Sequence, residues 1–203
     1  MNNGMIRHIL SVTLLLTGSV FSYGQEFEKN LATARTAYSA GNLEEARFAM
    51  EQMIRDLDFA IGRELLSLLP TQLGSAKYDP QRDNVTGNTG FAGVTIQRTY
   101  GTGDDATNID IIGNSPMIGS INAILSLPFV GNSADGSQRV IKIAGYKGVL
   151  QKNVDSEMNK VDYTIQIPLN NSLLTLNAKT SDEAEAIAWA NSIPVKEIAA
   201  LIQ

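Results

Sequence analysis

Residues 161–178 read VDYTIQIPLNNSLLTLNA, and this stretch decides the fold class. Polar and apolar residues alternate on both sides of the Asn170-Asn171 pair, which is typical of strands with one buried face. Asparagine accepts the left-handed backbone of a tight turn. The stretch therefore predicts a hairpin, with antiparallel strands at 161–169 and 173–178.

The chain after residue 90 extends this pattern in both directions. Further strands are predicted at 94–100, 108–112, 139–146 and 148–152. Helices are predicted at 114–128, at 180–191 after a capping box, and at 193–202. Strands joined by short turns form an antiparallel sheet. We therefore expect an α+β fold, with an antiparallel sheet of about six strands and helices packed on one face.

The predicted core consists of the inward-facing residues of these strands and helices. They are Val94, Ile96, Ile109, Ile111, Ile121, Ile124, Leu125, Ile141, Ile143, Ile165, Ile167, Leu174, Leu176, Ile187 and Trp189. A mature chain of this size can bury such a core without disulfides.

An N-terminal helical hairpin is predicted at 25–69, a stretch rich in Ala, Glu and Leu and free of Pro. Its first helix carries an apolar face formed by Phe27, Leu31, Ala34 and Tyr38. Gly41 supplies a helix stop, and Asn42 supplies a cap for a second helix that ends at Pro70. The second helix has an apolar stripe broad enough to be covered on more than one side.

Four segments follow from these patterns. They are a signal peptide at 1–24, the helical hairpin at 25–69, a linker at 70–90 and the sheet domain at 91–203. Glycine and proline steps mark the linker.

The turn of the hairpin resembles that of a tetratricopeptide repeat. The matching residues are Ala34, Ala37-Tyr38, Gly41-Asn42 and Glu44-Glu45-Ala46. Only one copy is present, whereas a solenoid needs about three, so a hairpin that packs on its own domain is favoured over a tandem-repeat groove. By its layout the whole chain resembles exported bacterial proteins of unassigned role that join a helical hairpin to a small α+β domain. This likeness implies no site residues.

The first 24 residues have the features of a signal peptide. Arg7 precedes an apolar run at 9–21, and the residues before Gln25 are small where a signal peptidase reads them. We therefore expect export, with the protein periplasmic or secreted, and a retained anchor is the alternative. No later stretch approaches the roughly 18 apolar residues of a membrane helix.

Charge and composition limit the possible functions. Loss of Arg7 with the leader changes the net charge from −5 to −6, which argues against binding to nucleic acid. The chain has no cysteine, and its single histidine, His8, lies in the predicted leader. The mature chain therefore lacks the residues for a Ser-His-Asp triad, a thiol nucleophile or a Cys/His metal site. This predicts a non-enzymatic protein without a cofactor, and a carboxylate- or Ser/Lys-based hydrolase is the third interpretation.

Arg98 and Tyr100 are candidate ligand-binding residues. They share a strand face with Val94 and Ile96, and with Tyr163 they predict the mouth of a small-ligand pocket between sheet and helix. The alternative is a strand end where these side chains emerge at the rim.

Asp104, Asp105 and Asp110 are weak candidates for a calcium site. Their spacing does not match an EF-hand loop, so a solvated turn between two strands is favoured.

Met50, Met53 and Leu57 on the second helix are a candidate partner surface, because thioether side chains adapt to different contacts. The alternative is ordinary core, and exposure of several hundred Å² would favour an interface. The first hypothesis is an exported envelope protein that acts as a protein-interaction module, bound to another envelope protein or to itself. The second is a small-ligand-binding protein.

Overall fold

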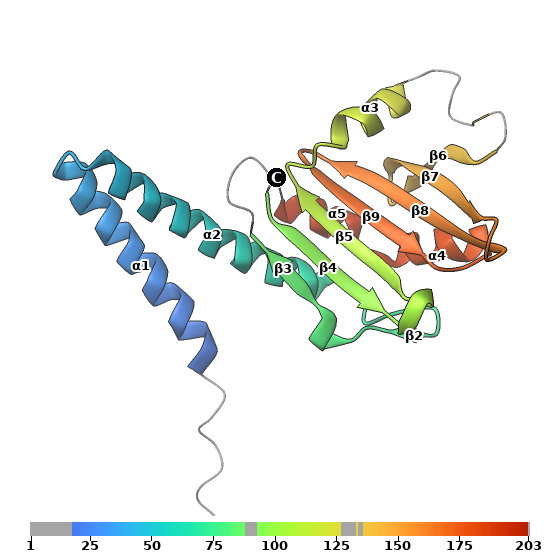
Figure 1. Cartoon of the computed structure of the whole chain (residues 1–203), viewed down its shortest axis with the longest axis horizontal. Coiled ribbons are helices and arrows are strands. Elements are labelled where there is room, and N and C mark those ends of the chain that lie inside the picture. The colour runs from blue at the N-terminus through green and yellow to red at the C-terminus, as the bar shows by residue number, and fades with distance from the viewer. Residues whose placement is uncertain (1–17, 88–92, 127–132, 134–135, 203) are drawn as a thin grey trace, which may run out of the picture. The chain divides into compact units, whose positions relative to one another are not determined.

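The computed structural model describes residues 18–87, 93–126, 133 and 136–202, with side chains from residue 25 onward. The chain divides into two compact units, Met1–Asp56 and Leu57–Gln203. The first unit contains a helical hairpin and the second contains a sheet (Figure 1). Each unit is described by itself.

The hairpin consists of α1 (Gly18–Ser39) and the first part of α2 (Leu43–Leu68). Gly41 has a φ of 78°, the left-handed conformation that ends a helix at little cost for glycine. Asn42 caps α2, because its Oδ1 accepts a hydrogen bond from the Glu45 backbone amide at 3.3 Å. Its own side-chain amide donates to Glu45 at 2.8 Å. The predicted hairpin turn is confirmed.

The helix α1 begins before the predicted cleavage position. It starts at Gly18 and continues through Gln25, while residues 1–17 of the predicted signal peptide lie outside the described residues. Within the described part of the chain, no helix combines the length and the apolar character needed to cross a membrane.

A seven-stranded antiparallel sheet forms the second unit. Its strands are β3 (Asn84–Thr86), β4 (Thr95–Tyr100), β5 (Thr107–Gly113), β6 (Gln138–Ile143), β7 (Tyr146–Asp155), β8 (Lys160–Leu169) and β9 (Ser172–Ala178). Their spatial order is β3-β4-β5-β9-β8-β7-β6, so the predicted 161–178 hairpin lies near the centre. Asn170 has a φ of 54° at its turn, and Ile165 lies opposite Leu176. The α+β fold class is confirmed.

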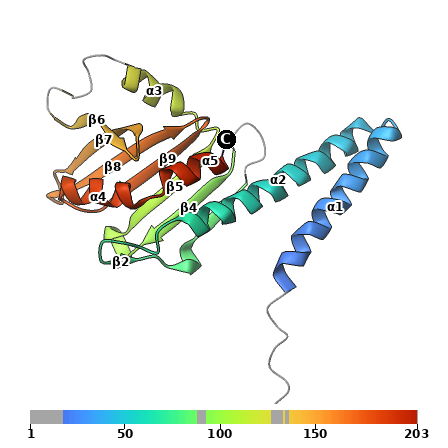
Figure 2. The same cartoon turned by 180° about the vertical axis from the view of Figure 1, so that it is seen from behind.

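One face of the sheet holds the main core. Cross-strand rows of aliphatic side chains run over it, for example Ile109, Leu176, Ile165 and Leu150. The helices α4 (Glu183–Ser192) and α5 (Val195–Leu201) cover this face and lie in front of the sheet in Figure 2. Leu65 of α2 belongs to the same core.

The opposite face is covered at one end by α3 (Ile118–Ser126). Ile121 packs there against Val149 of β7 and Leu173 of β9. Successive residues of a strand point to opposite faces, and each of these two residues is followed by a leucine of the main core. Helices therefore lie on both faces of the sheet, and the prediction that they pack on one face is wrong in this detail.

Most of the predicted core is confirmed. Its fully buried members are Ile96, Ile109, Ile111, Ile121, Ile143, Ile165, Ile167, Leu174 and Leu176. The remaining six, namely Val94, Ile124, Leu125, Ile141, Ile187 and Trp189, are half-buried and pack against it. Buried leucines at 65, 69 and 73 also belong to this core, although they precede the predicted sheet domain.

The segment predicted as a linker contains short elements of its own. These are β1 (Gln72–Leu73), β2 (Ala76–Lys77), the 3₁₀ helix η1 (Pro80–Arg82) and the strand β3, while residues 88–90 lie outside the described residues. The strand β3 pairs with β4 and adds the seventh strand. Its three residues are too few to show the alternation that marks a strand.

The last two predicted helices are present, but α4 begins later than its predicted capping box. Asp182 is the cap, because its Oδ1 accepts a hydrogen bond from the Ala184 amide at 2.8 Å. Thr180 instead bonds the carboxylate of Glu185.

Gly148 in β7 permits a close approach to β8. A Cβ atom at this position would lie 2.8 Å from the backbone carbonyl oxygen of Gln166. We expect Gly148→Ala to lower the free energy of unfolding by about 1–3 kcal/mol, because overpacking forces β7 and β8 apart. Urea denaturation followed by circular dichroism measures this.

Gly119→Ala is the matched control, because no atom lies within 4 Å of a Cβ at that position in α3. Because alanine favours a helix more than glycine does, we expect Gly119→Ala to raise the free energy of unfolding by roughly 0.5–1 kcal/mol. A Gly148→Ala variant as stable as the wild type would contradict the close approach.

Candidate functional site

The Arg98 guanidinium on β4 lies in the interior of the second unit. Its Nε and Nη2 donate to the two carboxylate oxygens of Asp83 at 3.0 and 2.5 Å. Its Nη1 donates to the carbonyl oxygen of Leu69 at 3.0 Å. The guanidinium carbon lies 4.1 Å from the centre of the Tyr78 ring. Every nitrogen of this buried cation therefore faces a group of its own chain.

Tyr100 is fully buried on the same strand, and its hydroxyl donates to the carbonyl oxygen of Pro70 at 2.9 Å. Burial raises the pKa of this phenol, which keeps it a neutral donor. Arg98 and Tyr100 thus hold residues 69–83 against β4. They lie neither at a pocket mouth nor at the sheet rim, because the preceding segment folds over them.

Tyr163 does not join these two residues. It is buried opposite Ala178 of β9, whereas Tyr100 pairs with Thr107 of β5. The strands β5 and β9 separate β4 from β8, which places the two tyrosine backbones roughly 14 Å apart at normal strand spacing. Burial, with smaller contributions from Glu183 and Asp182, raises the pKa of Tyr163. The three predicted ligand residues are therefore not brought together.

The predicted acidic cluster is divided between two places. Asp104 and Asp105 lie in the 3₁₀ helix η2 (Gly103–Asp105), where Asp105 pairs with Lys160 at 2.9 Å. Asp110 lies on β5. Among the residues that the structure describes, no group of three or more carboxylates, histidines and cysteines could hold a metal ion.

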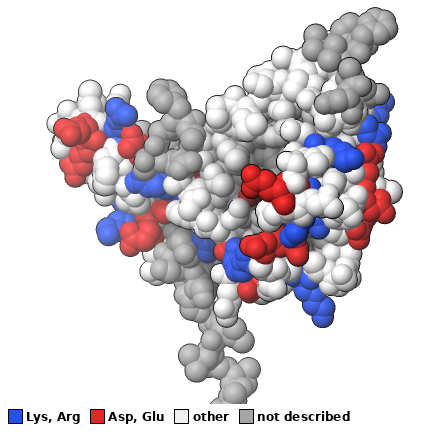
Figure 3. Space-filling model, turned by 45° about the vertical axis from the view of Figure 1, so that its right-hand side comes forward, with Lys and Arg blue, Asp and Glu red and all other residues white. Residues whose placement is uncertain are grey.

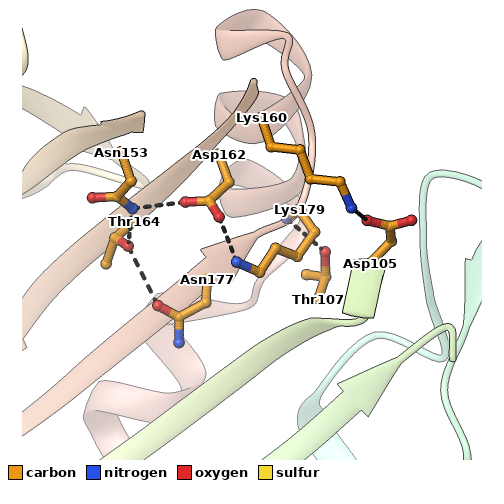
Figure 4. Close-up of polar contacts among 8 residues, drawn as sticks. All are labelled: Asp105, Thr107, Asn153, Lys160, Asp162, Thr164, Asn177 and Lys179. Carbon is orange, nitrogen blue, oxygen red and sulfur yellow. Dashed lines mark hydrogen bonds and ion pairs between the residues drawn. The ribbon is translucent and has the colours of Figure 1, made fainter. Parts of the chain in front are cut away.

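A polar network crosses the sheet face opposite the main core, and Figure 4 shows the part of it that includes Asn153, Asp162, Thr164, Asn177 and Lys179. It links Gln97, Asp110, Asn177, Thr164 and Asn153 in spatial order, at donor–acceptor distances of 2.8, 3.1, 3.4 and 3.0 Å. Asn153 also donates to Asp162 at 2.8 Å, and Lys179 pairs with the second oxygen of Asp162. Each side chain has a partner within the network, so the network stabilises cross-strand contacts.

Charged residues of both signs are mixed on the second unit. Lys160, Lys179 and Arg139 each pair with a carboxylate. On the face that Figure 3 displays, blue and red atoms are interspersed. Nucleic-acid binding is typical of a basic patch, and this face does not present one.

The hairpin of the first unit exposes a large apolar surface. Its members are Leu31, Tyr38, Leu43, Met50 and Ile54, with exposed fractions between 37% and 67%. We call these five residues the hairpin apolar surface. Leu57 continues the same stripe of α2 and is also exposed, whereas Met53 is half-buried. Two of the three residues predicted as a partner surface are thus exposed.

A repeated sequence pattern explains this exposure. Residues 31–38 read LATARTAY and residues 43–50 read LEEARFAM, so both helices carry Leu-x-x-Ala-Arg-x-Ala followed by Tyr or Met. The four alanines of the pattern, Ala34, Ala37, Ala46 and Ala49, are buried between the helices. The alanines thus occupy the sides on which the two helices face each other, and the larger residues beside them stay exposed.

The large residues of both helices lie on the same side of the hairpin. At 100° per residue, the large residues of each helix lie about 90° around the helix axis from its two buried alanines, in the same rotational sense. Two antiparallel helices are related by a two-fold axis perpendicular to the plane that contains them. Rotation about this axis exchanges the helices but does not exchange the two faces of the hairpin, so the large residues of both helices lie on the same face.

The apolar face predicted for the first helix is divided in the structure. Of its members, Ala34 is buried, whereas Leu31 and Tyr38 are exposed. The signal that could have located the contact is the repeated alanine pair at a spacing of three.

Comparisons with known proteins identify no relative of the chain. No family model, no curated protein and no solved structure matches the chain. The resemblances to a tetratricopeptide turn and to exported hairpin proteins stay predictions.

The buried Arg98–Asp83 pair leads to a stability prediction. We expect Asp83→Ala to lower the free energy of unfolding by about 3–5 kcal/mol, because it leaves a buried guanidinium without its carboxylate. The exposed Arg47–Glu51 pair on α2 is the matched control, and Glu51→Ala should lower the free energy of unfolding by at most about 0.5 kcal/mol. Chemical denaturation measures both. Equal costs for the two variants would contradict the interior position of Arg98.

Asp110 leads to a pH prediction. Burial raises the pKa of its carboxyl above the ordinary value of 3.8, and hydrogen bonds from Gln97 and Asn177 oppose that rise. A raised pKa in the folded state gives stability that is present below the unfolded value and is lost as the pH rises through the folded value. As the pH rises from the unfolded-state pKa of Asp110 through its raised folded-state pKa, the free energy of unfolding of the wild type should therefore fall relative to that of Asp110→Asn.

Two measurements check this expectation. Denaturation at a series of pH values gives the difference between the wild type and Asp110→Asn. Carbon-detected NMR of the Asp110 carboxyl gives its midpoint directly, and a midpoint at or below the ordinary value of 3.8 would contradict the buried environment.

Proposed function

We propose that the chain is an exported, non-enzymatic envelope protein whose hairpin apolar surface binds a helical segment of a protein partner. The exposure of five large apolar side chains on one side of the hairpin carries this proposal. Solvent contact at such side chains is unfavourable, and a partner that covers them gains the free energy of their burial.

The exposed area is sufficient for a specific interface. With ordinary whole-residue areas, the exposed fractions of the five residues amount to on the order of 600 Å², at the upper end of the largest patch on a typical monomer. A standard interface buries about 800 Å² on each partner. In this proposal, polar residues at the edge of the surface contribute the remaining area of about 200 Å².

The spacing of the surface favours a helical partner. Leu31 and Tyr38 are seven residues apart, as are Leu43 and Met50, and Leu57 follows after seven more. Heptad spacing gives a straight seam along each helix, and side chains of another helix fit between its members. Apolar seams on one side of a helical hairpin are typical of helices that pack in a bundle.

The other hypotheses have less support. The small-ligand hypothesis depends on Arg98, Tyr100 and Tyr163 as pocket residues. The first two form hydrogen bonds with residues 69–83 of their own chain. A mature chain without cysteine or histidine has few groups for acid–base or nucleophilic catalysis near neutral pH. The signal-like leader supports export.

In-cell crosslinking followed by affinity capture tests the proposal. We expect the wild type to capture one protein whose identity mass spectrometry gives, and Met50→Glu/Ile54→Glu to reduce its yield at least tenfold. Both residues are exposed, at 48% and 58%, so the variant should fold. Circular dichroism checks this.

Met158→Glu is the matched control, since Met158 is 65% exposed in the turn between β7 and β8. It should capture as much partner as the wild type. Equal yields from all three proteins, or loss with Met158→Glu alone, would contradict a role for the hairpin.

A further inference from the structure

We propose that the partner is a second copy of this chain, and that two hairpin apolar surfaces pair face to face in an antiparallel four-helix bundle. This inference rests on the proposed function and names its partner. Three observations on the first unit support it: the internal symmetry of the surface, the arrangement of charge along its edges, and its area.

The surface is built from two equivalent halves. The pattern at 31–38 recurs at 43–50, and in an antiparallel hairpin these segments are related by a local two-fold axis. A surface with this symmetry is well suited to an isologous contact, in which the same residues meet across a dyad. Two stacked helical hairpins form a four-helix bundle with the seams inside.

The charges beside the surface are complementary in the antiparallel arrangement. Arg35 and Arg47 hold equivalent positions next to the seams, near the turn of the hairpin. Glu28 and Glu51 lie on the same flanks but farther from the turn, one or two helical turns away, and Glu51 pairs with Arg47 of its own helix at 2.9 Å. When the turn of one copy lies over the open end of the other, Arg35 faces Glu28 of the other copy, and the Arg47–Glu51 pair faces its counterpart. In the parallel arrangement, like charges would meet.

The area and the charge favour a protein copy over a lipid surface. Each copy offers on the order of 600 Å² of exposed apolar residues, close to the 800 Å² or so that each side of a stable dimer buries. A lipid-binding helix is typically rich in Lys and Arg on its polar face. Here both signs flank the seams, and the whole chain has a net charge of −5.

The antiparallel two-fold places Met50 at the centre. Met50 and Leu31 lie midway along the surface, while Leu43 lies at the turn. In this arrangement α2 crosses over α2 of the other copy, so the two Met50 side chains meet at the axis. The two Leu43 side chains lie at opposite ends of the bundle. The chain contains no cysteine, so a single introduced cysteine reports this geometry without interference.

Sedimentation velocity and disulfide crosslinking test the proposal on protein purified from cells that express the full sequence. We expect a concentration-dependent dimer, and we expect Met50→Glu to raise its dissociation constant at least 100-fold, because two like charges would meet at the axis. Met158→Glu should leave it unchanged. Under oxidised glutathione, Met50→Cys should form the covalent dimer at least tenfold faster than Leu43→Cys or Met158→Cys.

Each other outcome overturns a defined part of the inference. A monomer at all concentrations, or binding to phosphatidylglycerol vesicles in place of dimerisation, rejects the second copy. A dimer that Met50→Glu does not weaken rejects this surface. Faster crosslinking of Leu43→Cys than of Met50→Cys rejects the antiparallel arrangement. A monomer that still loses an identified partner on Met50→Glu/Ile54→Glu leaves the proposed function standing.

Discussion

The single apolar stripe of α2 is the constraint on which the organisation of the chain depends. At its C-terminal end, Leu65 is fully buried in the core of the sheet unit, with Ile61 packed against it. At its N-terminal end, Met50 and Ile54 lie on the same stripe and face solvent. The contact with α1 does not use this stripe, because alanines at 46 and 49 form the contact line beside it. The C-terminal half of the stripe is thus buried within its own unit, and the N-terminal half is exposed.

In the sheet unit, by contrast, most of the polar side chains singled out above are paired within the unit. Arg98 and Tyr100 hold the segment after α2 onto β4, and the network around Asp110 and Asn177 pairs polar side chains over the outer face. Arg98 and Tyr100, two of the residues that the sequence suggested for ligand binding, already have partners within the unit. The hairpin, in contrast, leaves large apolar side chains exposed.

The sequence predicted most of the fold because its signals are local. Alternation at 161–178, the Asn170 turn and the Asn42 cap are properties of a few consecutive residues. The errors arose from contacts between distant residues. Nothing local shows that Asp83 neutralises Arg98 at a separation of fifteen residues, or that β3 is long enough to pair. The apolar face predicted for the first helix groups Leu31 and Tyr38 with Ala34, but of these three only Ala34 is buried.

Isotope-filtered NMR on a mixture of methyl-labelled and unlabelled protein tests the central claim most directly. A pairing of two hairpin apolar surfaces predicts intermolecular contacts from the Met50 and Ile54 methyl groups, and none from Met158 in the sheet unit. Contacts of the Met50 methyl with its own chain alone, at concentrations where sedimentation shows a dimer, would contradict the account.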